Sequence, residues 1–444
     1  MDANESRLEA LDLNRQGELL IQNKNFDKAR EKLDQAIELA PMVMESYKNY
    51  GDLCMETQQF AKAKTYYKKA LLIEKRGELY FLYGNACFMN DNAHEGLENY
   101  NLALTNGYDN EEMLFFMGMA YEHLNDDQMA LRYIQKACVK NPARPDFKVK
   151  KISIQLRLDM IDSAEETVEE LLKESPELFD GYHIKIQLLL NKGNIKEAIS
   201  FAKDATDRFP EDADLMFDYA KSMAVAQKFE EALRLIQHAK QMKYFEPAKR
   251  NFLLLEAQIA AEQTDMQKAI TCCETCKGLE NTTEENYFDG EARFMLVNLY
   301  LAEKNFDKAH EEANQIVEKD QEDRYYYAAL YYRAFCLQQL GKTQEAAALF
   351  QEAATIYRTK TLTNPNAVEI YLYRAMCMKD LEQYDKALEL LDFMTNITGE
   401  RAEIHMLRAE VYKLLGKTAL SDEEINNAIA LKPELKQGYG KEGE

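Results

Sequence analysis

Asn25-Phe26-Asp27-Lys28-Ala29 occurs a second time without change, as Asn305-Phe306-Asp307-Lys308-Ala309. Self-similarity of this kind indicates an array of one supersecondary unit. Three looser copies keep an aromatic residue with an alanine three positions later. They are Gln59-Phe60-Ala61-Lys62-Ala63, Lys228-Phe229-Glu230-Glu231-Ala232 and Gln383-Tyr384-Asp385-Lys386-Ala387.

The alanine of this segment belongs to a longer series of small residues. The first seven members are 33 or 34 residues apart, and the later ones mostly 37–41. A pair of helices, A and B, fits each interval, and few breakers (8 Pro, 17 Gly) interrupt the chain. Small side chains allow neighbouring helices to approach closely. The helix B series is Ala29, Ala63, Gly96, Ala130, Ala164, Ala198, Ala232, Ala269, Ala309, Ala346, Ala387 and Ser421.

This pattern resembles the tetratricopeptide (TPR) repeat family, which has a 34-residue period. The second copy shows the motif well, with Tyr50-Gly51, Ala63, Tyr67 and Ala70. About twelve units run from Ala10 to Leu435. The resemblance implies an all-α, right-handed superhelical solenoid of antiparallel helix pairs. The family's tryptophan early in helix A is absent, and tyrosines occupy that position in four units: Tyr47, Tyr80, Tyr182 and Tyr371.

The change in repeat length predicts two sub-arrays. Residues 1–240 form the regular one (units 1–7), residues 241–435 the one with longer units (units 8–12), and residues 436–444 a flexible tail. The alternative is that linkers drift in length without consequence, since longer exposed loops cost little. The extra residues fall around Tyr244–Pro247, Thr282–Gly290, Gln321–Tyr326 and Arg358–Asn366.

Charge and composition limit the classes of function. The chain has 55 Lys+Arg against 77 Asp+Glu, a net charge of −22, which disfavours nucleic acid and anionic membranes as partners. No apolar run approaches the length of a membrane span, and the first residues lack signal-peptide features. The eight cysteines are scattered, as in a protein with reduced thiols. We therefore expect a cytoplasmic protein.

Few residues suggest chemistry. Cys272, Cys273 and Cys276 lie close enough to bind a metal or to form a redox pair. Cys273 and Cys276 also occupy inward helix B positions, where cysteine acts as a small hydrophobe, and this structural interpretation is favoured. The six histidines are interpreted as ordinary polar residues, most of them at solvent-facing or groove positions. No phosphate loop or nucleophile motif occurs. We expect neither an enzyme nor a cofactor, and an enzyme or metal protein centred on the three cysteines is the alternative.

In the family that the chain resembles, one face of helix A lines a concave groove where partners bind. Counting turns from the small helix A position predicts an apolar floor for this groove. The alternative is that these side chains pack between units. The tyrosines at 325–327, 331 and 332 form the densest aromatic cluster. For this cluster, packing in the core and contact with a partner are equally favoured interpretations. The predicted partner-binding residues are Phe81, Phe115, Met119, Phe217, Leu254, Phe294, Tyr331, Phe335, Leu372 and Met376.

An acidic rim is predicted beside this floor, in the first turn of helix A. It suggests a partner with apolar anchors and Lys or Arg. The alternative is that these acids only complement the helix dipole. The rim consists of Glu45, Glu78, Glu112, Asp146, Asp180 and Asp214.

The predicted function is a non-catalytic scaffold that binds a protein or peptide in the groove. A carboxylate clamp of the family type is rejected for units 1–3, because Glu18 and Glu78 occupy two of its positions. Two alternatives stay open. One is a peptide-responsive regulator without a DNA-binding domain, and the other is a structural protein that self-associates through its last unit.

Overall fold

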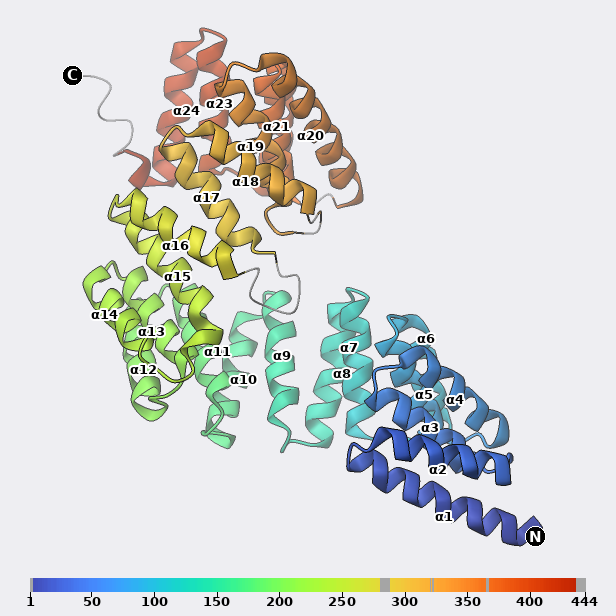
Figure 1. Ribbon diagram of the computed structural model, residues 1–444. Coiled ribbons are helices and arrows are strands. Elements are labelled where there is room, and N and C mark those ends of the chain that lie inside the picture. Colours follow the sequence, from blue (N-terminus) through green and yellow to red (C-terminus); the bar gives the residue numbers. More distant parts are fainter. Residues whose placement is uncertain (1–2, 280–287, 320, 322, 365–366, 437–444) are drawn as a thin grey trace. The chain divides into compact units, whose positions relative to one another are not determined.

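The computed structural model describes residues 3–279, 288–319, 321, 323–364 and 367–436. The described residues contain 24 α-helices, which follow one another as twelve A–B pairs (Figure 1). The chain divides into two compact units, Met1–Pro210 and Glu211–Glu444. Each unit holds six pairs. Most A helices pack chiefly against the helix B that follows, whereas α19 and α21 pack at least as extensively against the helix B that precedes them. The all-α architecture of antiparallel helix pairs is confirmed.

Unit 1 contains α1 to α12. Its A helices are α1 (Ala3–Gln22), α3 (Met44–Glu56), α5 (Gly77–Met89), α7 (Glu111–His123), α9 (Pro145–Arg157) and α11 (Phe179–Asn191). Its B helices are α2 (Phe26–Leu39), α4 (Phe60–Ile73), α6 (Ala93–Thr105), α8 (Asp127–Lys140), α10 (Ile161–Glu174) and α12 (Ile195–Arg208).

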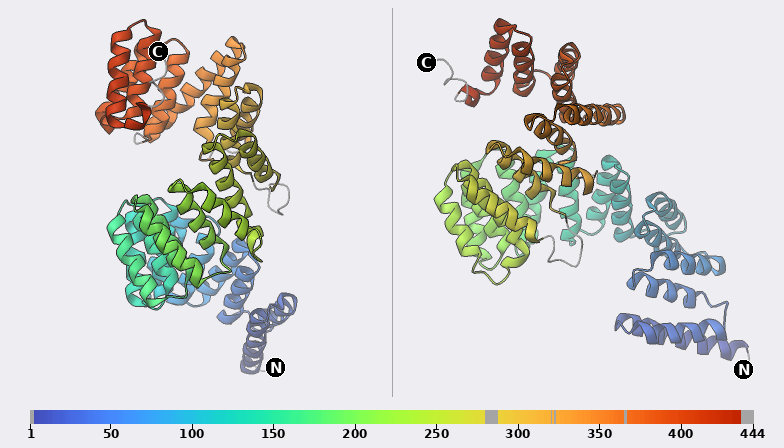
Figure 2. Two further views of the ribbon diagram at one scale, coloured as in Figure 1. Left: turned by 90° about the vertical axis from the view of Figure 1, so that its left-hand side faces the viewer. Right: turned by 45° about the horizontal axis from the view of Figure 1, so that its top comes forward.

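Unit 2 contains α13 to α24 and a short 3-10 helix, η2 (Pro433–Leu435) (Figure 2). Its A helices are α13 (Ala213–Val225), α15 (Phe245–Glu262), α17 (Gly290–Ala302), α19 (Tyr326–Gln339), α21 (Val368–Asp380) and α23 (Ala402–Leu414). Its B helices are α14 (Phe229–Ala239), α16 (Met266–Gly278), α18 (Phe306–Lys319), α20 (Thr343–Thr363), α22 (Tyr384–Thr398) and α24 (Thr418–Leu431).

The small residues of helix B are all buried, as the repeat predicted. The helix A residue that faces each of them is also buried, and the backbones of the two helices approach closely. A Cβ added to Gly51 would come within 2.4 Å of the Tyr67 ring, and one added to Gly118 within 2.6 Å of Ile134. The aromatic residue of the repeated segment begins helix B, as in α2, α4, α14, α18 and α22. The register read from the sequence is therefore correct throughout.

The longer units owe part of their length to longer helices. Residues 245–247 extend the start of α15, and α20 runs on to Thr363. Pro247 lies in the first turn of α15, where its missing N–H is tolerated. Pro145 likewise begins α9. Most of Thr282–Gly290 lies outside the described residues, as does nearly all of the predicted tail. The predicted sub-array boundary at residue 240 stays a prediction.

None of the helices in the described ranges is both long and apolar enough to cross a membrane.

Every turn from helix A to helix B contains one residue with a positive φ. Three turns use glycine there (Gly193, Gly341 and Gly416), and nine use other residues. This left-handed conformation costs an L-residue roughly 1–2 kcal/mol. Thr264, with φ 62°, is the unfavourable case because its side chain is β-branched.

We therefore expect Thr264→Gly to stabilise the protein by about 1 kcal/mol, since glycine adopts this conformation freely. The control is Thr271→Gly in the exposed interior of α16, which should lower stability by roughly 0.3–0.5 kcal/mol. Urea-induced unfolding followed by circular dichroism would measure both. A lower unfolding midpoint for Thr264→Gly would contradict the prediction.

Candidate functional site

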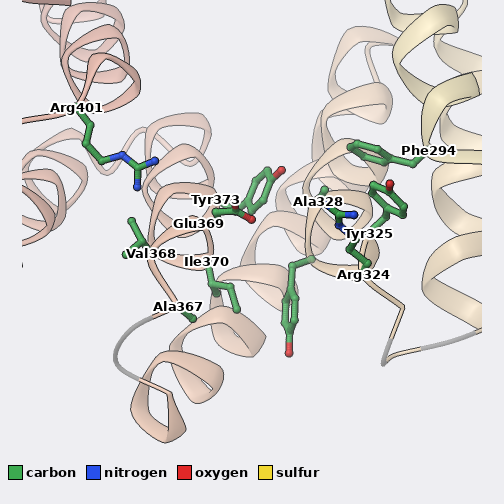
Figure 3. A pocket seen from close by; sticks show the side chains of 11 residues that line it. Phe294, Arg324, Tyr325, Ala328, Ala367, Val368, Glu369, Ile370, Tyr373 and Arg401 are labelled. Atoms are coloured by element: carbon green, nitrogen blue, oxygen red, sulfur yellow. The ribbon is translucent and has the colours of Figure 1, made fainter. Parts of the chain in front are cut away.

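A concave surface with three adjoining pockets lies in unit 2, along the A helices α17, α19, α21 and α23. Its largest part, the α19–α21 pocket, has a volume of about 600 Å³. Side chains from α17, α19 and α21 and from the linkers before α19 and α23 converge on it (Figure 3). Its lining is Phe294, Arg324, Tyr325, Tyr327, Ala328, Ala367, Val368, Glu369, Ile370, Tyr373 and Arg401.

Two smaller pockets continue this surface. The α21–α23 pocket, about 240 Å³, shares Tyr373 and Arg401 with the first. The terminal pocket, about 270 Å³, shares Leu372 and Glu403 with the second. We call the three together the unit 2 groove. The terminal pocket is mostly apolar, and its lining is Leu372, Met376, Ala402, Glu403, Met406, Leu407, Glu410, Lys432 and Leu435.

A layer of packed aromatic rings supports the groove from behind. Phe294 stacks on Tyr325 with ring centroids 4.8 Å apart. The buried Tyr331 packs against Phe335 and donates a 2.8 Å hydrogen bond to Asp380. Burial raises the pKa of the Asp380 carboxyl, and the neighbouring Lys379 opposes this shift. Rings fixed in this way give the groove a floor that is preorganised for binding.

A second aromatic contact fixes the wall between α19 and α21. Tyr357 of α20 donates a 2.6 Å hydrogen bond to the Tyr327 carbonyl oxygen, and its ring stacks on Tyr373. Burial raises the pKa of Tyr373 to about 12, so its hydroxyl is a proton donor at neutral pH. Of the five clustered tyrosines, Tyr326 and Tyr331 belong to the core and the other three are partly exposed.

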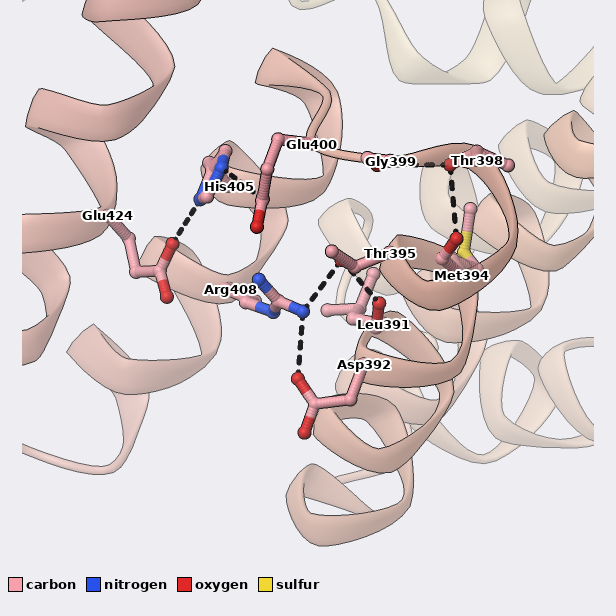
Figure 4. Close-up of polar contacts among 10 residues, drawn as sticks. All are labelled: Leu391, Asp392, Met394, Thr395, Thr398, Gly399, Glu400, His405, Arg408 and Glu424. Carbon is pink, nitrogen blue, oxygen red and sulfur yellow. Dashed lines mark hydrogen bonds and ion pairs between the residues drawn. The ribbon is translucent and has the colours of Figure 1, made fainter.

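A polar network holds the linker that carries Arg401 (Figure 4). His405 of α23 is buried between Glu424 of α24 and Glu400, whose carboxylate is 2.8 Å from Nε2. Each ring nitrogen of His405 thus faces one carboxylate. Arg408 bonds to both Asp392 and Thr395 of α22, at 2.8 Å each. His405 is thus a buried structural residue.

The ten predicted floor residues divide into three groups. Phe294, Leu372 and Met376 line the unit 2 groove. Phe81, Leu254 and Tyr331 are only 4%, 5% and 2% exposed, so for these three the packing alternative holds. The remaining four are half-buried and do not line the pockets above. They are Phe115, Met119, Phe217 and Phe335.

The predicted acidic rim lies in the first turn of helix A in each of its six units. Arg144 forms a two-nitrogen contact with Asp146 at 2.7 and 2.9 Å, and this holds the pKa of that carboxyl below its usual range. Arg76 lies 4.0 Å from Glu45. Glu78, Glu112 and Asp214 are exposed. Arginines thus compensate part of the rim.

The sequence analysis did not predict Arg324 and Arg401. Both precede a helix A, whereas the predicted floor and rim consist of residues within helix A. For Arg401, the sequence does contain a pattern that points to it. Arginine stands two residues before a first-turn acid at Arg76, Arg144 and Arg401. The missed Tyr373 lies one position after the predicted Leu372, and the α-helical turn brings both to the groove.

The three clustered cysteines face the core, as predicted for inward helix B positions. Cys273 and Cys276 are fully buried and Cys272 nearly so. Burial raises the pKa of Cys273 and of Cys276 to about 12. The Cys276 thiol approaches the Arg250 carbonyl oxygen at 3.5 Å. Within the described ranges, no group of three or more His, Cys, Asp and Glu is placed to hold a metal ion.

Comparison with known proteins identifies the class of protein. Tetratricopeptide repeat models match residues 10–42, 45–76, 185–243, 279–331 and 337–411, together more than half of the chain. The chain belongs to the tetratricopeptide repeat family. A search of curated proteins gives no match.

Several solved structures are similar to this chain. Yeast Tom70 is 14% identical, with 97% of this chain and 99% of that one covered and a TM-score of 0.48. A tetratricopeptide repeat protein from Parabacteroides merdae is 16% identical, with 58% and 98% covered and a TM-score of 0.46. The APC/C hetero-tetramer Cut9–Hcn1 is 14% identical, with 98% and 94% covered and a TM-score of 0.42.

Thiol reactivity tests the core position of the cysteines. At a pKa of about 12, roughly one thiol in ten thousand is ionised at pH 8. In native protein treated with iodoacetamide, we expect Cys138, which is partly exposed, to react before the seven buried cysteines. Mass spectrometry would locate the label, and all eight should react after denaturation. Rapid native labelling of Cys273 or Cys276 would contradict this.

Replacing His405 tests the network behind Arg401. His405→Ala removes the ring that faces two carboxylates, one of them mostly buried, and should cost about 1–3 kcal/mol. Hydrogen exchange of α23 and α24 amides should accelerate. His94→Ala, at an exposed position, is the control and should change neither quantity. Unchanged exchange in His405→Ala would show that the network does not hold this linker.

Proposed function

We propose that this chain is a non-catalytic, cytoplasmic scaffold that binds a segment of another protein in the groove formed by its A helices. The observation that carries the proposal is the unit 2 groove, in which three adjoining pockets follow α19, α21 and α23. Concave, largely apolar surfaces with a few directed polar groups are typical ligand sites. Apolar surface left open to solvent in this way is commonly covered by a partner.

The groove has features of a peptide site. Leu372 contributes to two of its pockets, beside Met376 and Met406 in the terminal one. Methionine adapts its shape to different apolar side chains. Fixed tyrosine rings add contact area at low cost in entropy. An apolar anchor residue of the partner fits this combination.

The acidic rim supports a further part of the proposal. In the first compact unit, Met1–Pro210, the exposed Glu78 and Glu112 would face Lys or Arg of a bound segment. Because the same acids also complement the helix dipole, salt-sensitive binding would be the sign of their use. Peptide-dependent regulation and self-association through the last unit stay predictions.

A display library of random peptides, selected on the full chain, tests the proposal. Selected peptides should bind Leu372→Glu at least about tenfold more weakly, because a charge in two apolar pockets is not solvated. Leu72→Glu is the matched control, since Leu72 is 82% exposed on α4 of unit 1. Circular dichroism would verify that both variants fold. Equal binding by Leu372→Glu and the intact chain would remove the unit 2 groove from the proposal.

A further inference from the structure

We propose that the α19–α21 pocket binds the carboxylate of an acidic side chain within the partner segment, while an aliphatic side chain of the same segment occupies the terminal pocket. This inference rests on the proposed function and specifies its ligand. It differs from the expectation for the acidic rim, which concerns basic residues and other units.

The first argument is that two arginines face the pocket with little compensation. Arg324 and Arg401 reach into it from opposite sides (Figure 3). The nearest carboxylate to Arg401 is that of Glu403, at 3.8 Å from Nε, and Glu403 is bound by Lys432. Among the residues that the structure describes, Arg324 has no ion pair within 4.0 Å, and its guanidinium lies 5.7 Å from the Tyr325 ring centre.

Two other arginines that also precede or end a helix A are held differently. Arg144 and Arg157 each bind an aspartate through two nitrogens, with contacts from 2.7 to 3.1 Å. In a chain with 77 acidic and 55 basic residues, carboxylates are abundant. Two guanidinium groups that point into one cavity therefore stand out as donors available to an external acceptor. Guanidinium and carboxylate have matching planar geometry.

The second argument comes from the hydroxyl groups on the pocket wall. Tyr325 and Tyr373 both line it. Burial raises the pKa of each hydroxyl, so both stay protonated at neutral pH. A protonated phenol donates a hydrogen bond to a carboxylate. With the arginines, the pocket offers charged and neutral donors to an anion.

Glu369 limits what this pocket accepts. It lies between the two arginines, beside Tyr373 (Figure 3). Two positive side chains and one negative leave the lining with a single positive charge. One carboxylate is balanced by this site, whereas a second would be repelled by Glu369. The pocket is therefore matched to one acidic residue, and Glu369 weakens its binding.

The third argument is the apolar continuation of the groove. The terminal pocket joins the α19–α21 pocket through residues of the α21–α23 pocket, and Leu372, Met406 and Leu407 line it. An extended segment that places its carboxylate between Arg324 and Arg401 would thus lead an aliphatic side chain toward these residues. An acidic residue and an aliphatic anchor together define the proposed ligand.

Synthetic peptides provide the probe. Each is acetylated and amidated, so that neither terminus is charged, and carries one glutamate and one leucine separated by one to six serines. Matched sets contain glutamine or lysine in place of glutamate. Fluorescence anisotropy with the full chain should show the glutamate set binding about tenfold or more tightly than the other two at one spacing, as charge-assisted hydrogen bonds require. The preference should weaken at high salt.

Variants locate the effect. Arg324→Gln and Arg401→Gln should each remove most of the preference for glutamate over glutamine, and Glu369→Gln should increase it. Arg234→Gln is the matched control, because Arg234 is an exposed arginine on α14 outside the pocket. All four residues are on the surface or at its edge, and circular dichroism with thermal unfolding would verify their folding.

The outcomes separate this inference from the proposed function. If glutamate and glutamine peptides bind equally and Leu372→Glu weakens both, the groove binds peptides but the carboxylate site is wrong. Tighter binding of the lysine set would also overturn it. Glutamate-dependent binding that persists in both arginine variants would place the acidic residue elsewhere. If no peptide of any set binds, both the inference and the proposed groove fail.

Discussion

The fold depends on close approach of helix backbones at one small side chain in each helix B. That position holds alanine in ten units, glycine in one and serine in one, and every one of them is buried. At the facing glycines of helix A, even a methyl group would collide with a tyrosine ring, a leucine or an isoleucine. Since interiors are packed as densely as crystals, this contact fixes how each pair sits. The larger side chains then fill the space between consecutive pairs.

The groove follows from the same contact. Once a helix pair is fixed, the residues on the exposed face of helix A are placed at a set distance from those of the next A helix. In unit 2 the longer repeats bring tyrosines to this face, and hydrogen bonds from Tyr331 and Tyr357 hold two of them in the layer behind it. Rigidity in the floor and adaptable methionines at one end make a surface that can order a flexible segment at low entropic cost.

The sequence predicted the helical register, because this depends on periodicity alone. Of the predicted floor residues, Phe294, Leu372 and Met376 line pockets of the unit 2 groove, and their use in binding stays a prediction. The sequence could not separate Phe294, which lines a pocket, from Phe81, which is buried, although both occupy the same position of the repeat. Their exposure depends on which rings pack beside them, and Phe81 is covered by Tyr108 and Phe116. Arg401 was missed because its direction is set by a linker held through Glu400 and His405, a long-range arrangement without periodicity.

The left-handed residue in each A–B turn has a consequence for how this chain tolerates changes of length. In every pair, the small helix B residue lies twelve positions after a buried residue of helix A, and the positive φ always falls seven positions after that helix A residue. All variation in repeat length therefore lies after the small residue of helix B, in the end of helix B, in the linker or in the start of the next helix A. Foreign segments, tags or fused domains inserted within the chain would be accommodated at B–A linkers, whereas one residue added to an A–B turn would shift helix B out of register with its partner.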